Sequence, residues 1–276
     1  MSVLTRGSED EKTNRTADHK RNQDGQEVHL PMNVVCIIPS RYHSSRFNGK
    51  PLADLCGRPM IQHVYERVMQ AKTLSYAAVA TDDERIFAAV QKFGGRAVMT
   101  SPRHRSGTDR IAEAVAGLGL KADDIVVNIQ GDQPLFEPAQ IDEVAAPLLA
   151  DPLIPMSTLI YKIIREEEIF HPNAVKVVFD SDYFALYFSR ATLPYVRDRG
   201  CHVDYFKHHG IYAYRRDFLD TFTGLPEGKL EKLEALEQLR ALEHGYRIKV
   251  VVTKHDSVEV DTPEELARVR DIIKGE

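Results

Sequence analysis

The sequence predicts an α/β fold with a mainly parallel sheet, because short apolar runs alternate with helical patterns along its first half. The runs read as buried strands and are separated by amphipathic segments. The expected strands are residues 34–38, 76–80, 96–99 and 125–130, and the expected helices are residues 60–71, 83–93 and 109–117. This order implies βαβ units, right-handed crossovers and helices on both faces of the sheet.

The second half continues the pattern with more strands and fewer helices. Expected strands are residues 156–163, 175–179, 184–187, 211–214 and 248–253, and expected helices are residues 216–223, 230–243 and 262–273. Leucines at every third position predict one apolar ridge on the helix 230–243, which Gly245 should end. No Pro/Gly-rich linker and no internal repeat separates the halves. We expect one domain, with an inserted subregion that returns to the main sheet.

The first 31 residues are polar and almost without large apolar side chains. Such a segment cannot offset the entropy lost on ordering, so we expect residues 1–31 to be a disordered extension. Met32 directly precedes the first expected strand. The predicted domain therefore covers residues 32–276.

The composition favours an intracellular enzyme of modest charge. A net charge of −5 gives no general reason to bind nucleic acid or an anionic membrane. Three cysteines without metal-type spacing fit reduced thiols. No run of eighteen apolar residues would span a bilayer, and the N-terminus has no signal-peptide core. We expect a cytoplasmic protein.

A basic loop follows the first strand. Pro39 stops the strand, and Arg41, Arg46 and Lys50 fall within the next eleven residues. A solvated basic loop is the plain alternative. The position favours a site, because open α/β sheets bind ligands at the carboxyl ends of their strands, where cations and backbone N–H groups can hold phosphates.

Two aspartates also follow expected strands. Asp132 comes after the strand 125–130 and would suit Mg²⁺ beside phosphate oxygens, although a simple turn explains the local sequence equally well. Asp261 precedes a helix start in which Thr262, Pro263 and Glu265 are good capping residues. Capping does not require Asp261, so this residue is a further candidate.

Eight short motifs, in order, resemble the sugar nucleotidyltransferases. The similarity is greatest to the cytidylyltransferases that activate 3-deoxy-D-manno-octulosonate (Kdo), and it covers about residues 33–273. The motifs are residues 39–52, 80–83, 106–110, 128–134, 187–191, 208–212, 236–240 and 260–264. The resemblance implies a Rossmann-like nucleotidyltransferase fold of the GT-A type, with an inserted region for the sugar and the dimer contact.

The resemblance also implies roles for particular residues. Lys50, Arg41, Asp132 and Asp261 would be catalytic, and the two aspartates would hold Mg²⁺. Nucleotide contacts would come from Arg41, Arg46, Lys50, Thr81, Asp82, Ser106, Gly107, Thr108 and Gln130. Helix capping is the alternative reading for Ser106 and Asp82.

The sugar side is implied in the second half of the chain. Its expected residues are Arg190, His208, Tyr212, Glu234 and Gln238, with Arg190 for the sugar carboxylate. Asn48 stands where relatives usually have proline. Gln133 replaces a frequent glutamate, which leaves the exact sugar open, since some relatives of this form act on the 8-amino analogue of Kdo.

The predicted reaction is transfer of CMP from CTP to Kdo, giving CMP-Kdo and pyrophosphate for lipopolysaccharide synthesis. The 8-amino analogue or another acid sugar is the nearest alternative. A related glycosyltransferase would normally carry an Asp-x-Asp motif, which residues 130–132 lack, and a non-catalytic module would not need the intact charged set. The resemblance implies a homodimer.

Overall fold

The computed structural model describes residues 32–43, 47–198, 200 and 203–275. Residues Met32–Glu276 group into one compact unit. The predicted disorder of residues 1–31 lies outside the described residues, as does Arg46. Among the described residues, no helix has the length and apolar character to cross a membrane.

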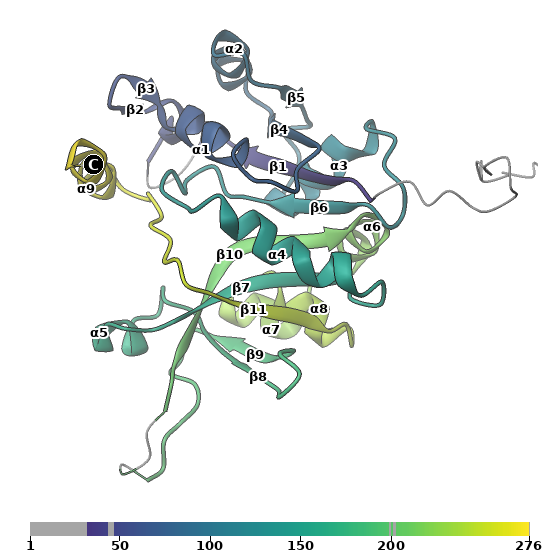
Figure 1. Ribbon diagram of the computed structural model, residues 1–276, viewed down its shortest axis with the longest axis vertical. Coiled ribbons are helices and arrows are strands. Elements are labelled where there is room, and N and C mark those ends of the chain that lie inside the picture. The colour runs from purple at the N-terminus through teal and green to yellow at the C-terminus, as the bar shows by residue number, and fades with distance from the viewer. Residues whose placement is uncertain (1–31, 44–46, 199, 201–202, 276) are drawn as a thin grey trace, which may run out of the picture. The chain divides into compact units, whose positions relative to one another are not determined.

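The core of the unit is a mixed sheet in which seven strands form one continuous path, ordered β11-β7-β10-β6-β1-β4-β5 (Figure 1). Their bounds are β1 Val34–Ser40, β4 Tyr76–Thr81, β5 Ala97–Met99, β6 Ile125–Asn128, β7 Met156–Lys162, β10 Phe206–Arg215 and β11 Ile248–Thr253. Pairing is parallel along this path except at β10, which runs antiparallel to both β6 and β7. The prediction of a mainly parallel α/β sheet is confirmed.

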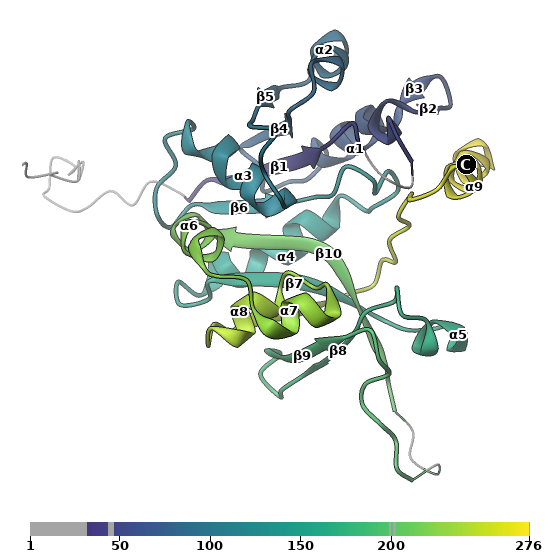
Figure 2. The ribbon, with the colours of Figure 1, turned by 180° about the vertical axis from the view of Figure 1, so that it is seen from behind.

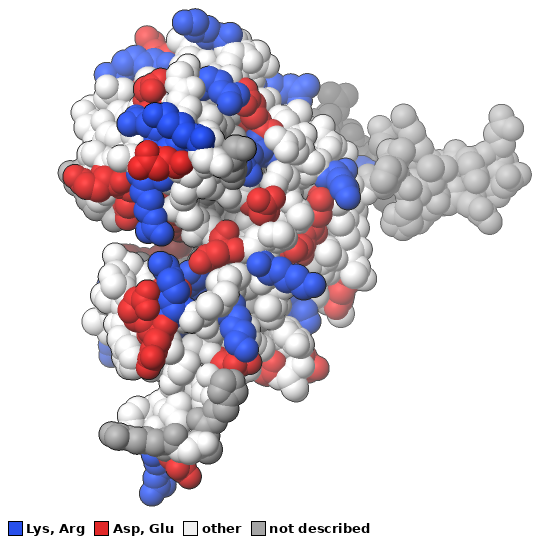
Figure 3. Space-filling model, turned by 60° about the vertical axis from the view of Figure 1, so that its left-hand side comes forward, with Lys and Arg blue, Asp and Glu red and all other residues white. Residues whose placement is uncertain are grey.

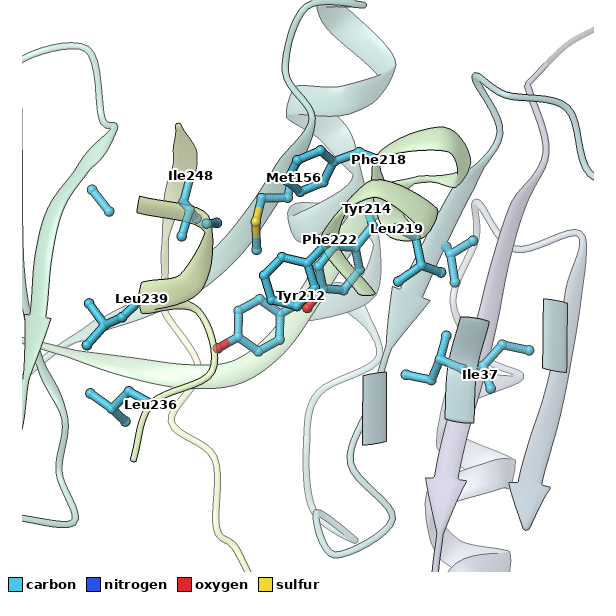
Figure 4. Close-up of a cluster of buried hydrophobic side chains, with 14 of the residues drawn as sticks. Ile37, Met156, Tyr212, Tyr214, Phe218, Leu219, Phe222, Leu236, Leu239 and Ile248 are labelled. Carbon is cyan, nitrogen blue, oxygen red and sulfur yellow. The ribbon is translucent and has the colours of Figure 1, made fainter. Parts of the chain in front are cut away.

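Helices cover the sheet on both faces (Figures 1 and 2). One apolar core packs α1 (Met60–Val68), α2 (Glu84–Lys92) and α4 (Ala139–Ala150) against the sheet. The other packs α3 (Gly107–Ala116) and α6 (Arg216–Gly224) against the opposite face. Aromatic side chains of β10 and α6 form the centre of this second core, as Figure 4 shows for Tyr212, Tyr214 and Phe222. Two dry faces hold the strand ends in fixed positions.

A smaller branch extends from β10. Strands β8 (Lys176–Phe179) and β9 (Ala185–Ser189) pair antiparallel, and β8 contacts β10 at Lys207. The short helix α5 (Glu166–Phe170) precedes this branch, and helix α9 (Pro263–Gly275) closes the chain. This branch is where an inserted subregion was expected.

The single helix expected over residues 230–243 is wrong. The segment forms two short helices, α7 (Lys229–Glu234) and α8 (Leu239–Glu243), because Ala235 adopts a left-handed conformation with φ of 50°. Leu236 and Leu239 are buried, whereas Leu233 is 73% exposed, so the leucine ridge is not one continuous face. The regular leucine spacing concealed the break.

The sequence also missed several elements. Helix α4 was not expected, and neither were α5 and the small hairpin of β2 (Asp54–Leu55) and β3 (Arg58–Pro59). Strand β10 begins five residues before its expected start at residue 211. Pro147 lies inside α4, and such an internal proline argues against a helix in a pattern-based prediction.

Candidate active site

A cavity of about 480 Å³ opens where the carboxyl ends of β1 and β6 meet the segment before α9. Parallel strands bring the residues that follow them to the same edge of a sheet, which is why this edge collects the polar loops. Lysine, arginine, aspartate and glutamate side chains stand on both sides of a hollow in this face (Figure 3). The wall comprises Pro39, Ser40, Arg41, His43, Lys50, Pro51, Arg105, Ser106, Gly107, Gln130, Gly131, Asp132 and Asp261.

Lys50 joins the two aspartates at one end of this cavity. Its Nζ donates to Oδ2 of Asp132 at 2.8 Å and to Oδ1 of Asp261 at 3.1 Å. Burial disfavours the charged ammonium, but the charge of Asp132 and the hydrogen bonds to both carboxylates outweigh it and raise the pKa of Lys50. Lys50 is therefore a fixed cation in this structure.

Local backbone geometry places Lys50. Gly49 has a φ of 73°, a conformation open to glycine at low cost, and its N–H donates to the carbonyl of Tyr42 at 2.8 Å. The turn leads into a short 3₁₀ helix, Lys50–Leu52, in which Pro51 is buried. The loop thus closes on itself and directs the lysine toward the cavity.

Asp132 and Asp261 are 129 positions apart in the sequence but adjoin in space. The N–H of Val260 donates to the carbonyl of Asp132 at 2.9 Å, and the side chain of Val260 is fully buried against Leu55 and Met60. On its other side Asp261 enters α9, where Glu265 accepts from the N–H groups of Asp261 and Thr262. The backbone therefore fixes both carboxylates.

The pair of carboxylates fits a magnesium ion in its donor chemistry. Mg²⁺ is commonly bound by one or two carboxylates together with water and substrate phosphates. Among the described residues, no group of three or more histidine, cysteine, aspartate or glutamate side chains is arranged to hold a metal. Two aspartates beside a phosphate-sized basic cavity match this partial ligand set.

Glu259 lies beside this pair and was not expected from the sequence. Its Oε1 accepts from Nε2 of Gln133 at 3.2 Å. The side chain is reached by solvent, yet protein surrounds it. Burial, with the charges of Asp132 and Asp261, raises the pKa of Glu259 to about 7. A lone glutamate in an alternating strand-like segment gives no sequence signal for such a role.

The expected nucleotide contacts divide into two groups. Arg41, Lys50, Ser106, Gly107 and Gln130 line the cavity together, and the sequence did not indicate His43 and Arg105, which line it as well.

Thr81, Asp82 and Thr108 do not line that cavity. Thr81 is fully buried at the end of β4, and Asp82 lies 3.2 Å from Nη2 of the buried Arg110. Thr108 donates through Oγ1 to Glu237 at 2.5 Å. Their contact with a nucleotide stays a prediction.

Ser106 has the capping role that was weighed as an alternative, and it also lines the cavity. It caps α3 by accepting from the N–H of Asp109 at 3.0 Å, while Asp109 accepts from the N–H of Ser106. The following Gly107 packs against Pro39, where an added Cβ would come within 3.3 Å of Cγ. The structural and functional readings of this segment are compatible.

Among the expected sugar residues, His208 and Tyr212 adjoin on β10, with ring centroids 5.2 Å apart. Burial and the neighbouring His209 lower the pKa of His208 to about 3, so its imidazole is neutral at ordinary pH. Its Nε2 lies 3.1 Å from Oγ1 of Thr158. His208 also lines a second cavity, of about 540 Å³, whose wall includes Lys207, Asp256 and Glu259.

Arg190 and Glu234 form a separate cluster. The Arg190 guanidinium donates to three carbonyls, of Glu234 at 2.7 Å, Pro172 at 3.1 Å and Ala235 at 3.4 Å. The Glu234 carboxylate accepts from the N–H of Arg190 and from the hydroxyl of Ser189. In this structure Arg190 therefore ties the end of α7 to β9, and neither residue lines the two cavities.

Gln238 is almost fully buried, and its amide Nε2 has no hydrogen-bond partner among the described residues. A buried amide without a partner is costly, so this donor is available to a bound polar group. The role of Gln238 toward a sugar stays a prediction.

Comparison with known proteins points in one direction. The profile of the family described as "Cytidylyltransferase" matches residues 35–249. The chain is 75% identical, over 88% of its length and 98% of the relative's, to a 3-deoxy-manno-octulosonate cytidylyltransferase of Syntrophus aciditrophicus (strain SB). It is 56% identical, over 86% of its length and 97% of the relative's, to an 8-amino-3,8-dideoxy-manno-octulosonate cytidylyltransferase of Shewanella sp. (strain ANA-3).

A solved structure shares the fold. The CMP:2-keto-3-deoxy-manno-octonic acid synthetase complexed with CTP is 43% identical, with a TM-score of 0.83, over 88% of this chain and 99% of that one. At this identity and coverage, the sequence and structural similarities extend over nearly the whole described unit.

Proposed function

The chain belongs to the cytidylyltransferase family, and we propose that it transfers CMP from CTP to the anomeric hydroxyl of Kdo, with release of pyrophosphate. The 75% identity to a relative named for this activity supports the sugar, and the solved synthetase with CTP supports the nucleotide. The expected fold and enzyme class are confirmed by the same similarities.

The observation that carries this proposal is the position of Lys50 between Asp132 and Asp261 on the wall of a basic cavity. Such a wall provides cations for a triphosphate and carboxylates for a metal within one small volume. Nucleotidyl transfer needs both, because the phosphates accumulate negative charge as pyrophosphate leaves.

The chain's own residues then act by positioning and charge. Arg41 and Arg105 line the cavity and would hold phosphate oxygens, and Lys50 would neutralise the departing pyrophosphate. Asp132 and Asp261 would hold Mg²⁺, which when bound supplies charge neutralisation at the phosphates and a more acidic sugar hydroxyl. Ser106 and Gly107 would present backbone groups to the base at the start of α3.

On the sugar side, the neutral His208 can accept or donate one hydrogen bond, and Tyr212 adds a hydroxyl beside it. No described side chain is needed as a covalent nucleophile, since in-line attack by the sugar hydroxyl completes the reaction. We further propose that the enzyme works as a homodimer in the cytoplasm and supplies lipopolysaccharide synthesis.

A second candidate substrate is the 8-amino analogue of Kdo. The observation that favours it is Glu259, which lines the cavity shared with His208 and contacts Gln133, the residue that replaces a frequent glutamate. A carboxylate at this point would pair with an ammonium group on the sugar.

The test is a paired assay of pyrophosphate release with CTP and each sugar. A kcat/KM at least about tenfold higher for Kdo supports the first proposal. The reverse preference, lost in Glu259→Gln, supports the second. Absence of release with either sugar contradicts both.

A further inference from the structure

Lys50 occupies the position where its ammonium neutralises both of the carboxylates assigned to the metal. The distances of 2.8 Å to Asp132 and 3.1 Å to Asp261 are those of full charge-assisted hydrogen bonds. The lysine side chain is only 12% exposed, so solvent screens these contacts weakly. The carboxylates are thus already paired with a cation when no substrate is bound.

We propose that Lys50 is a resident counter-ion of the Asp132–Asp261 pair, so that a divalent cation binds there tightly only after a nucleoside triphosphate has drawn the ammonium away. The inference rests on the proposed function and adds to it a coupling between metal and nucleotide. It concerns the order of binding, which the residue roles alone do not specify.

Competition between the two cations is the physical basis. A divalent ion that uses these carboxylates meets an ammonium within hydrogen-bonding distance of both, and like charges so close repel strongly where solvent is excluded. Metal binding in the free enzyme must therefore break two charge-assisted hydrogen bonds. Each such bond is strong enough to lower metal affinity by roughly tenfold or more.

A triphosphate offers the ammonium a new partner. Lys50 lines the same cavity as Arg41 and Arg105, and a lysine side chain has four flexible bonds with which to follow a phosphate. The backbone can stay in place while the side chain moves, because Pro51 is buried and the Lys50 carbonyl accepts from the N–H of Ala53 at 3.1 Å. Once the ammonium leaves, Asp132 and Asp261 repel each other and attract a divalent ion.

Two consequences follow from linkage. Nucleotide should raise metal affinity, and metal should raise nucleotide affinity by the same factor. Without the ammonium, the metal should bind the free enzyme directly and most of this coupling should vanish. An alternative in which Lys50 merely contacts phosphate predicts weaker nucleotide binding in the variant but no gain in metal affinity.

The experiment measures Mn²⁺ binding to the full chain by electron paramagnetic resonance, with no sugar present. Titrations with and without a non-hydrolysable CTP analogue give the coupling for the parent, Lys50→Met and Lys50→Gln. The matched control is Lys162→Met, because Lys162 forms another lysine–aspartate pair, with Asp204 at 2.7 Å, on β7. A double variant, Lys50→Met with Asp261→Asn, tests whether the metal uses this pair.

We expect the analogue to tighten Mn²⁺ binding to the parent and to the control by roughly tenfold or more. We expect nucleotide-free Lys50→Met to bind Mn²⁺ roughly tenfold tighter than the parent, and the double variant to lose that gain. Unchanged or weaker metal binding in both Lys50 variants overturns the proposal. Absence of coupling in the parent also overturns it, even if the variants fail to fold. Because no sugar or turnover enters these titrations, an error in the proposed sugar leaves their result intact.

Discussion

Lys207 in β10 lies 2.9 Å from the carboxylate of Asp256, which is on the segment that carries Asp261 toward α9. The same ammonium lies 2.9 Å from Glu168, and Nε2 of His209 lies 3.3 Å from Asp256. Lys207 and His209 are nearly buried, so this cluster attaches the segment firmly to the sheet. The attachment lies outside the first cavity but fixes the approach to the metal ligand.

Asp256→Asn should therefore lower both stability and turnover. Loss of a partly buried charge pair should cost about 1–2 kcal/mol of unfolding free energy, less than for a fully buried pair because Asp256 is 39% exposed. A less fixed Asp261 should raise the Mg²⁺ concentration needed for half-maximal rate. Denaturant unfolding and magnesium titration of the rate measure these effects. The control Asp204→Asn removes the exposed partner of Lys162 and should change stability by less than about 0.5 kcal/mol. A variant as active and as stable as this control contradicts the prediction.

Acid should remove the stabilisation that Asp256 provides. Burial opposes its charged form, but bonds from His209 and Lys207 outweigh burial and lower the pKa of Asp256 below its ordinary value of 3.8. The unfolded chain then binds more protons at low pH, so the contribution is complete above that ordinary value and declines as the pH falls below it. The stability difference between the parent and Asp256→Asn should be constant near neutral pH and shrink toward pH values of about 3. A difference that grows on acidification refutes this assignment.

Asp132→Asn and Asp261→Asn should each abolish turnover, because each removes part of one metal site. The double variant should cost little more than either single change, since residues that act as a unit are not additive. A chelator should silence the parent, and added Mg²⁺ should restore it. Single-turnover rates and the activity after chelation provide the measurement. Magnesium-dependent turnover retained in Asp261→Asn would leave that residue as a neighbour of the α9 cap only.

Arg190→Ala should affect the sugar more than the nucleotide. The KM for the acid sugar should rise while the affinity for CTP barely moves. The structure adds a second effect, because the guanidinium holds three carbonyls at the end of α7, so unfolding free energy should fall by about 1–3 kcal/mol. Arg247→Ala is a suitable control, since Arg247 forms an exposed pair with Asp180. An effect confined to CTP would contradict the sugar assignment.

Much of the fold could be predicted because its signals are local. The apolar run at residues 34–38 and the strand 125–130 were located from sequence alone, and both lie at the centre of the sheet. Elements with conflicting local signals were missed, as with Pro147 inside α4. The break at Ala235 was also missed, because a left-handed alanine is set by tertiary contacts around Glu234 and Arg190 and not by its own preference.

The sequence by itself determined the chemistry of the candidate site: cations in a loop after the first strand, aspartates after later strands, and family motifs in order. The tertiary structure alone decided which groups meet. It joined Lys50 to both aspartates, brought Glu259 beside them, and used Arg190 to hold backbone carbonyls. Strand periodicity and capping are local properties that a sequence records directly. Contacts across 82 to 211 positions depend on how the sheet and its covering helices pack, which no local pattern contains.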